Sequence, residues 1–202
     1  MKNRYMVFCV SFLAMTLGLT GCVAGQNIKL HYEPVTSNNF VSKQLVNIIV
    51  SDQREFVTSG NKSPWYIGHY RAGFGNTWDV VNYGKVPLAD QMKKDIQSEL
   101  LSLGFQSDPQ NISSKTVSVF VKNWNFDAMA NGELWYDITV VVSDSKGAAL
   151  ASVNLSEKKY IDGSFWTGAK GAMQKEVPKI YSDLIRSMIR DNPVVLAALK
   201  AS

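Results

Sequence analysis

The feature that most constrains the fold is a long stretch of alternating hydrophobic and polar residues between Thr116 and Leu155. A period of two is typical of strands that bury one face, since successive side chains of a strand point to opposite sides of the sheet. Two turn signals divide the stretch, Asn131-Gly132 and the segment 144–147. The sequence therefore predicts a meander of three antiparallel strands.

The first turn signal also predicts a register. A two-residue turn at Asn131-Gly132 pairs Val121 with Val142, Trp124 with Thr139 and Ala128 with Trp135. One face of the meander then carries mainly aliphatic residues: Val117, Val119, Val121, Leu134, Tyr136, Ile138, Val140 and Val142. The other face carries Phe120, Trp124, Phe126 and Trp135. These aromatic side chains are either covered by another segment as core or left as a partner-binding surface.

Two amphipathic helices flank the meander. Apolar residues recur at helical spacing at Leu88, Met92, Ile96, Leu100 and Leu103, and again at Met173, Val177, Ile180, Leu184, Ile185 and Met188. Gly104 closes the first helix, and Pro178 is expected to kink the second. The apolar run 45–50 predicts a buried strand before the first helix.

The expected fold class is therefore α+β. We expect a single domain with an antiparallel β-meander, an N-terminal strand and two amphipathic helices packed on one sheet face.

The N-terminus has the pattern of a signal peptide. Lys2 and Arg4 precede an apolar run, 6–17, that is shorter than the about 20 residues needed to span a membrane. The following Leu19-Thr20-Gly21-Cys22 resembles the lipobox of bacterial lipoproteins, which implies cleavage before Cys22 and attachment of diacylglycerol to its thiol. We expect a signal peptide over 1–21, a lipidated tether over 22–43 and a single periplasmic α+β domain over 44–202.

The lipobox also implies a location and a thiol content. Val23, where inner-membrane lipoproteins of many Gram-negative bacteria have Asp, favours the outer membrane, facing the periplasm. Cys9 lies in the discarded segment and Cys22 is alkylated, so no disulfide is expected.

Several function classes lack support in the sequence. Lys2 and Arg4 contribute two of the net charge of +4, and the remaining basic residues are scattered, so no nucleic-acid partner is expected. The chain has two histidines and lacks the H-E-x-x-H, C-x-x-C and G-x-S-x-G motifs. Gly84-Lys85 is followed by Val86 where a phosphate loop needs Ser or Thr. We therefore expect no enzyme activity, no cofactor and no metal.

The candidate partner-binding residues are aromatic. The segment 65–83 is dense in aromatic side chains and predicts two extended arms, 65–71 and 77–82, joined as a hairpin. Tyr and Trp are enriched at binding hot spots. The candidates are Trp65, Tyr66, Tyr70, Phe74, Trp78, Trp124 and Trp135. Burial decides between core and site. His69 reads as a packed or surface histidine, and Asp52 and Arg54 as a structural pair.

Three short motifs occur in a characteristic order: Asp52-Gln53-Arg54, Leu103-Gly104-Phe105 and Asp162-Gly163-Ser164-Phe165. Together with the lipobox, this order resembles the YajG-like bacterial lipoproteins over about residues 44–199. The resemblance implies an envelope lipoprotein. We expect a binding or scaffolding module for another envelope protein, or for a second copy of itself. The alternative is a transport-accessory lipoprotein that binds an apolar ligand or lipid.

Overall fold

The structure is a computed structural model that describes residues 26–35, 44–71, 76–107, 115–163 and 168–201. Cys22 and the proposed signal peptide lie outside these residues. The strands are β1 Gln26–Ile28, β2 Leu45–Asp52, β3 Tyr66–Arg71, β4 Thr77–Asn82, β5 Gln106–Ser107, β6 Lys115–Ala128, β7 Gly132–Asp144 and β8 Ala149–Ile161. The helices are α2 Glu55–Thr58, α3 Leu88–Ser102, α4 Gly168–Met188 and α5 Pro193–Lys200, with a 3-10 turn at Tyr83–Lys85.

The predicted meander is present, but the sheet around it is mixed. β6, β7 and β8 pair antiparallel, as the alternation predicts. The other edge of β6 is shared by two strands that run parallel to it. β2 lies beside residues 115–121, and β3 lies beside Asp127 and Ala128. The expected single α+β domain and its antiparallel meander are confirmed. The expected sheet was incomplete, because β2 and β3 make parallel ladders that link eight strands into one mixed sheet.

The predicted register was also wrong. Val121 pairs with Ile138, four residues before the expected Val142. The turn comprises residues 129–131 and closes on the Ala128–Gly132 pair. Gly132 serves packing instead of the turn, since a Cβ at this position would lie 2.5 Å from Sδ of Met173 in α4.

An irregularity in β6 changes which side chains are buried. The register shifts between Val121 and Asn123, so Lys122 is an extra residue in a β-bulge. Buried residues alternate at Val117, Val119 and Val121 before the bulge, and at Trp124, Phe126 and Ala128 after it. Trp124 and Phe126 therefore share the core face with the valines, and their expected place on the opposite face was wrong. The valine face itself is as predicted, because a four-residue slip preserves the alternation.

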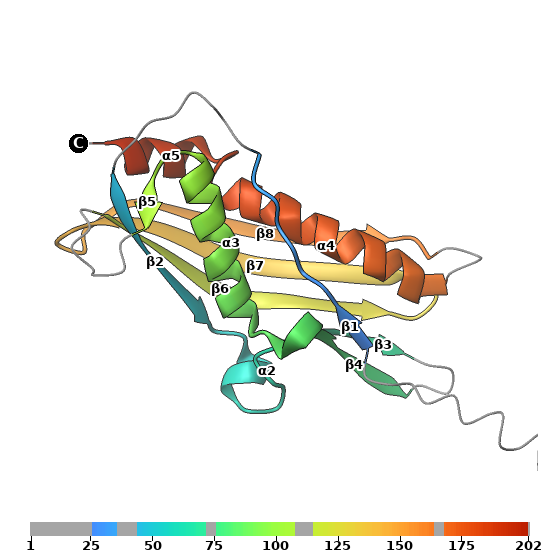
Figure 1. Ribbon diagram of the computed structural model, residues 1–202. Helices are drawn as coiled ribbons and strands as arrows, with labels where there is room; N and C mark the ends of the chain where they lie inside the picture. Colours follow the sequence, from blue (N-terminus) through green and yellow to red (C-terminus); the bar gives the residue numbers. More distant parts are fainter. Residues whose placement is uncertain (1–25, 36–43, 72–75, 108–114, 164–167, 202) are drawn as a thin grey trace, which may run out of the picture.

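The helices cover one face of this sheet. Figure 1 shows α3 and α4 lying across the same side, with α5 at the end of the molecule that carries the β7–β8 turn. α3 buries Leu88, Met92, Ile96 and Leu100, which are the residues predicted from its spacing. Its C-terminus has the predicted cap, since Gly104 has a φ of 86° and Phe105 N donates to Leu100 O at 3.0 Å. Pro178 lies inside α4, which continues as one helix from Gly168 to Met188.

Residues 26–35 belong to the folded domain, although the sequence placed them in the tether and offered only a short strand around 28–32. β1 pairs with β4, and Ile28, Leu30 and Tyr32 are at most 3% exposed. After β1 the chain passes over the sheet beside α3 and α4 (Figure 1). The Tyr32 hydroxyl donates to Glu99 of α3, and Arg190 Nη2 donates to the Val35 carbonyl at 2.8 Å. The folded domain therefore includes residues 26–35 and does not begin at residue 44.

Candidate functional site

The aromatic segment folds as the predicted hairpin. β3 and β4 pair antiparallel, with Tyr70 opposite Trp78 and Arg71 opposite Thr77. β3 also contacts the end of β6, so one side of the hairpin is built into the sheet. This attachment explains why part of an aromatic-rich segment became core.

The structure divides the candidate residues into two groups. Tyr66, Tyr70 and Trp124 are at most 7% exposed and belong to the core. Trp78 is 40% exposed, whereas Trp65 and Trp135 are half-buried. Phe74 and Cys22 lie outside the described residues. Of the predicted partner-binding aromatics that the structure describes, only Trp65, Trp78 and Trp135 can present surface to a partner.

Trp124 is the centre of an aromatic cluster under the helices. Its ring meets Tyr181 of α4 edge-on at 5.7 Å between centroids and stacks on Tyr136 at 6.3 Å. The Tyr181 hydroxyl donates to Asp95 Oδ2 of α3 at 2.7 Å, so the cluster ties both helices to the sheet. Burial and the Asp95 charge raise the pKa of Tyr181. This cluster is structural.

Polar groups gather where β3 runs beside the C-terminal end of β6. The Tyr66 hydroxyl donates to Asn125 Oδ1 and contacts His69 Nδ1, both at 3.0 Å. His69 Nε2 lies 3.3 Å from Asp127, whose carboxylate also accepts from Arg71 Nε at 2.9 Å. Burial, followed by the charges of Asp79 and Asp127, raises the pKa of Tyr66, so its hydroxyl stays protonated at neutral pH.

Each of these groups already has a protein partner. His69 uses both ring nitrogens, and Asp127 holds both His69 and Arg71. These contacts join the hairpin to β6, which agrees with His69 as a packed histidine.

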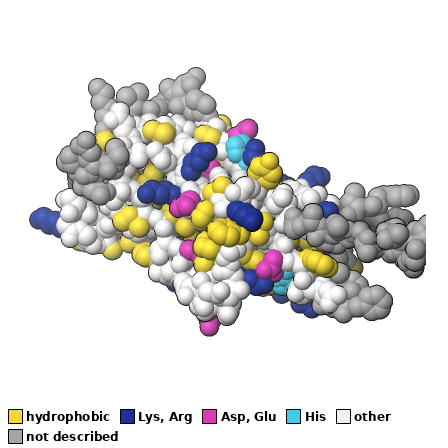
Figure 2. Space-filling model, turned by 60° about the horizontal axis from the view of Figure 1, so that its bottom comes forward, with side chains coloured by type: hydrophobic (Ala, Val, Ile, Leu, Met, Phe, Trp, Pro, Cys, Tyr) yellow, Lys and Arg dark blue, Asp and Glu magenta, His cyan; other side chains and the backbone are white. Residues whose placement is uncertain are grey.

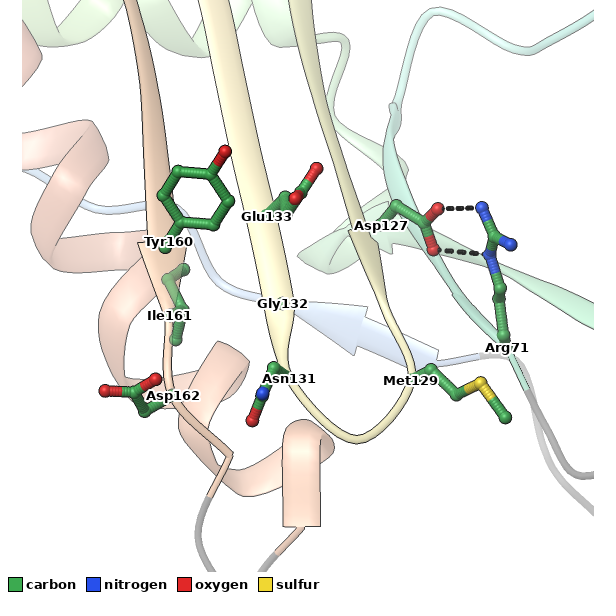
Figure 3. Close-up of a pocket in the computed structure, with 9 residues that line it drawn as sticks. All are labelled: Arg71, Asp127, Met129, Asn131, Gly132, Glu133, Tyr160, Ile161 and Asp162. Carbon is green, nitrogen blue, oxygen red and sulfur yellow. Dashed lines mark hydrogen bonds and ion pairs between the residues drawn. The ribbon is translucent and has the colours of Figure 1, made fainter.

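An open hollow of about 440 Å³ lies beside this cluster, at the end of the sheet. It is lined by Arg71, Asp127, Met129, Asn131, Gly132, Glu133, Tyr160, Ile161 and Asp162. In Figure 3 the Arg71–Asp127 pair forms one side, and Glu133 and Tyr160 stand on neighbouring strands across from it. We call this feature the sheet-end hollow.

A second cleft, of about 380 Å³, lies between the end of β8 and α4. It is lined by Lys159, Tyr160, Ile161, Asp162, Glu176, Lys179, Ile180 and Asp183. Most of these side chains are charged, with both signs present. We call this feature the β8–α4 cleft.

β8 forms a long open edge beside this cleft. Among the described strands it pairs only with β7, and it runs for 13 residues from Ala149 to Ile161. An edge strand presents unpaired backbone N–H and C=O groups that another extended chain can join. No short motif in the sequence marks this edge, although it follows from the last position of β8 in the meander.

The described residues contain no cluster of three or more His, Cys, Asp or Glu that could hold a metal ion. Within the same residues, no helix is both long and apolar enough to cross a membrane. On the face shown in Figure 2, hydrophobic side chains lie among charged side chains of both signs.

Comparisons with known proteins show the fold. No protein-family model matches the sequence, and no curated protein matches it. A crystal structure of a Xanthomonas campestris protein of the DUF330 family is similar, with a TM-score of 0.54 and 11% identity over 82% of this chain and 96% of that one. A second crystal structure, of an uncharacterized protein, has a TM-score of 0.50 and 12% identity over 83% of this chain and 98% of that one.

Lipoprotein B of Nitrosomonas europaea superposes more loosely, with a TM-score of 0.44 and 9% identity over 83% of this chain and 90% of that one. This chain has the fold of the DUF330 structure.

Proposed function

We propose that this protein is a YajG-like envelope lipoprotein, anchored by Cys22, that binds an extended segment of another envelope protein and performs no catalysis. The observation that carries this proposal is the open edge of β8 next to the β8–α4 cleft. The lipobox and the order of the three short motifs support the envelope location and the family.

Extended peptides commonly bind by adding a strand to an exposed sheet edge. The backbone ladder supplies affinity, and pockets beside the edge select alternate side chains. Here the cleft beside β8 offers Lys159 and Lys179 together with Glu176 and Asp183. A segment with charges of both signs matches this lining, and the half-buried Trp135, one strand away, adds apolar surface on the outer face of the sheet.

An apolar ligand or lipid, the alternative function, has less support. The space between helices and sheet is filled by the core, in which Trp124, Phe126 and Tyr181 are fully buried. The β8–α4 cleft is lined mostly by charged side chains, and the sheet-end hollow places four charged side chains, Arg71, Asp127, Glu133 and Asp162, beside apolar groups. A site for an apolar ligand is expected to be mostly apolar.

In-cell photo-crosslinking tests the proposed function. A photoreactive residue at the exposed Ser156 of β8 should yield an adduct with one envelope protein, and the attachment point should lie in an extended segment of it. The same residue at the exposed Lys94 of α3 is the matched control and should not yield that adduct. Co-purified lipid in native mass spectra, with no adduct from position 156, would favour the alternative.

A further inference from the structure

The short length of chain between the lipid anchor and the domain limits how far the domain can lie from the membrane. Three residues, 23–25, separate Cys22 from Gln26. Consecutive Cα atoms are 3.8 Å apart, so the Cα atoms of Cys22 and Gln26 lie within about 15 Å of each other. The headgroup layer of one leaflet accounts for about 5–7 Å of such a distance. If Cys22 carries the acyl chains, as the proposed function holds, β1 starts close to the bilayer surface.

The direction of β1 determines which end of the domain lies close to the bilayer surface. β1 runs parallel to β4, and Gln26 pairs with Val80. The N-terminal end of β1 therefore points toward Trp78 and Thr77, at the start of β4. Trp78 lies two residues before Val80, a distance of about 7 Å along the strand.

The same end carries other structural elements. β3 ends at Arg71 and lies beside the end of β6, so the turn that follows β6 is a near neighbour. Figure 1 shows this turn and the start of α4 at the same end as β1, with α5 at the opposite end. We call this region the anchor-side end and define it by Arg71, Thr77, Trp78 and Met129.

The chemistry of the anchor-side end suits a bilayer surface. Trp78 and Met129 are 40% and 61% exposed. Trp is enriched at membrane–water interfaces, where its ring sits at the level of the headgroups. Three acidic groups at this end are in ion pairs, Asp79 with Lys62, Asp127 with Arg71 and Glu133 with Lys158. Asp162, which lines the sheet-end hollow together with Arg71 and Met129, is an exposed acidic residue.

We propose that the anchor-side end rests on the bilayer that holds Cys22, with Trp78 at the level of the headgroups. This proposal rests on the proposed lipid anchor. It adds that the domain is held on the membrane in one orientation instead of hanging from a free tether. The β8 edge then extends away from the bilayer, toward α5.

Fluorescence quenching tests this orientation. The processed chain has no free thiol, so Thr77→Cys and Ser145→Cys each supply a single labelling site on the full-length lipidated protein. β7 has 13 residues, so Ser145 lies about 40 Å farther along the sheet than the β6–β7 turn. Each variant carries an environment-sensitive fluorophore in vesicles of phosphatidylethanolamine and phosphatidylglycerol that contain a lipid with a nitroxide on its headgroup.

The expected result is loss of most of the fluorescence at position 77 and almost none at position 145. Equal quenching at both positions, or stronger quenching at position 145, overturns the orientation. Flotation and intact mass on the same sample keep the two proposals apart. An acylated protein that floats without quenching at position 77 refutes the orientation alone, and a protein without acyl mass that does not float refutes the anchor as well.

A lengthened tether tests the contact of Trp78 itself. A long Gly-Ser segment inserted between Gly25 and Gln26 removes the constraint of the short connection. Position 77 should stay quenched in this background and lose its quenching when Trp78→Ser is added. If the long tether alone abolishes the quenching, Trp78 does not bind lipid and the proposed contact is wrong. A protein adduct from a photoreactive residue at position 78, in place of lipid adducts, would also contradict it.

Discussion

Arg54 Nε and Nη2 donate hydrogen bonds to the two carboxylate oxygens of Asp52, at 2.8 and 2.7 Å. The guanidinium is fully buried where β2 ends and β3 begins to pair with β6. It also donates to the carbonyls of Tyr66 at 2.6 Å and Pro64 at 3.0 Å. The structural role predicted for Asp52 and Arg54 is confirmed, because Arg54 satisfies backbone groups that the parting strands leave unpaired.

Arg54→Ala should lower the free energy of unfolding by about 3–5 kcal/mol, because it leaves a mostly buried carboxylate and two carbonyls without their donor. Urea denaturation of a soluble chain that starts at Val23 measures the change. Arg71→Ala is the matched control, since Arg71 pairs with Asp127 on the surface and its loss should change stability little. Equal effects of the two substitutions would contradict the role of Arg54.

Trp124→Ala should cost about 3–5 kcal/mol of stability, as is typical of large-to-small changes in a core. Trp124→Phe should cost less, since it keeps a ring against Tyr181 and removes an indole N–H that lacks a partner among the described residues. Thermal melting compares both with Trp78→Ala, which should melt close to the unchanged protein. A Trp78 variant as unstable as the Trp124 variant would show that both aromatics are core.

Leu30→Ala should destabilise the domain by about 2–5 kcal/mol, because Leu30 is 2% exposed within the segment that follows β1. The neighbouring Lys29 is exposed, so Lys29→Ala should leave stability unchanged. The same denaturation assay tests both. Two neutral substitutions would mean that residues 26–35 are a free tether after all.

The carboxyl of Asp95 gives stability a pH dependence. Burial raises its pKa above 3.8 more than the hydrogen bonds from Gln91 and Tyr181 lower it. The folded state therefore binds the proton more tightly than the unfolded state. This contribution to stability is fully present below pH 3.8 and is lost as the pH rises through the folded-state pKa.

Asp95→Asn should remove this fall in stability with rising pH, because the amide oxygen still accepts hydrogen bonds and the side chain does not become charged. Denaturation at a series of pH values should show a smaller fall in stability above pH 4 for the variant than for the unchanged protein. Parallel pH profiles would contradict the assignment to Asp95.

Cys22→Ser should abolish acylation and release the protein from the membrane, since stable anchoring needs more than one acyl chain and the variant carries none. Membrane fractionation and intact mass check this result. Retention of the variant with the outer membrane, together with an unchanged protein that lacks acyl mass, would refute the lipid anchor.

Local patterns in the sequence were enough to predict most of the helices and strands. The spacing of Leu88, Met92, Ile96 and Leu100 predicted the buried face of α3, and Gly104 predicted its end. Alternation predicted β6, β7 and β8, as well as the shared face of their valines. These signals are visible because they depend on the 3.6 and 2.0 residue periods of single elements.

Only the tertiary structure decided how the elements combine. The bulge at Lys122 turns Trp124 and Phe126 into the core, and alternation read along β6 by itself cannot locate an extra residue. The place of β2 and β3 beside one strand and the burial of Leu30 in the segment that follows β1 depend on contacts between distant residues. Such contacts depend on which apolar faces of different helices and strands can cover one another. The residue pattern of one segment shows that it has an apolar face, but not which other segment packs against that face.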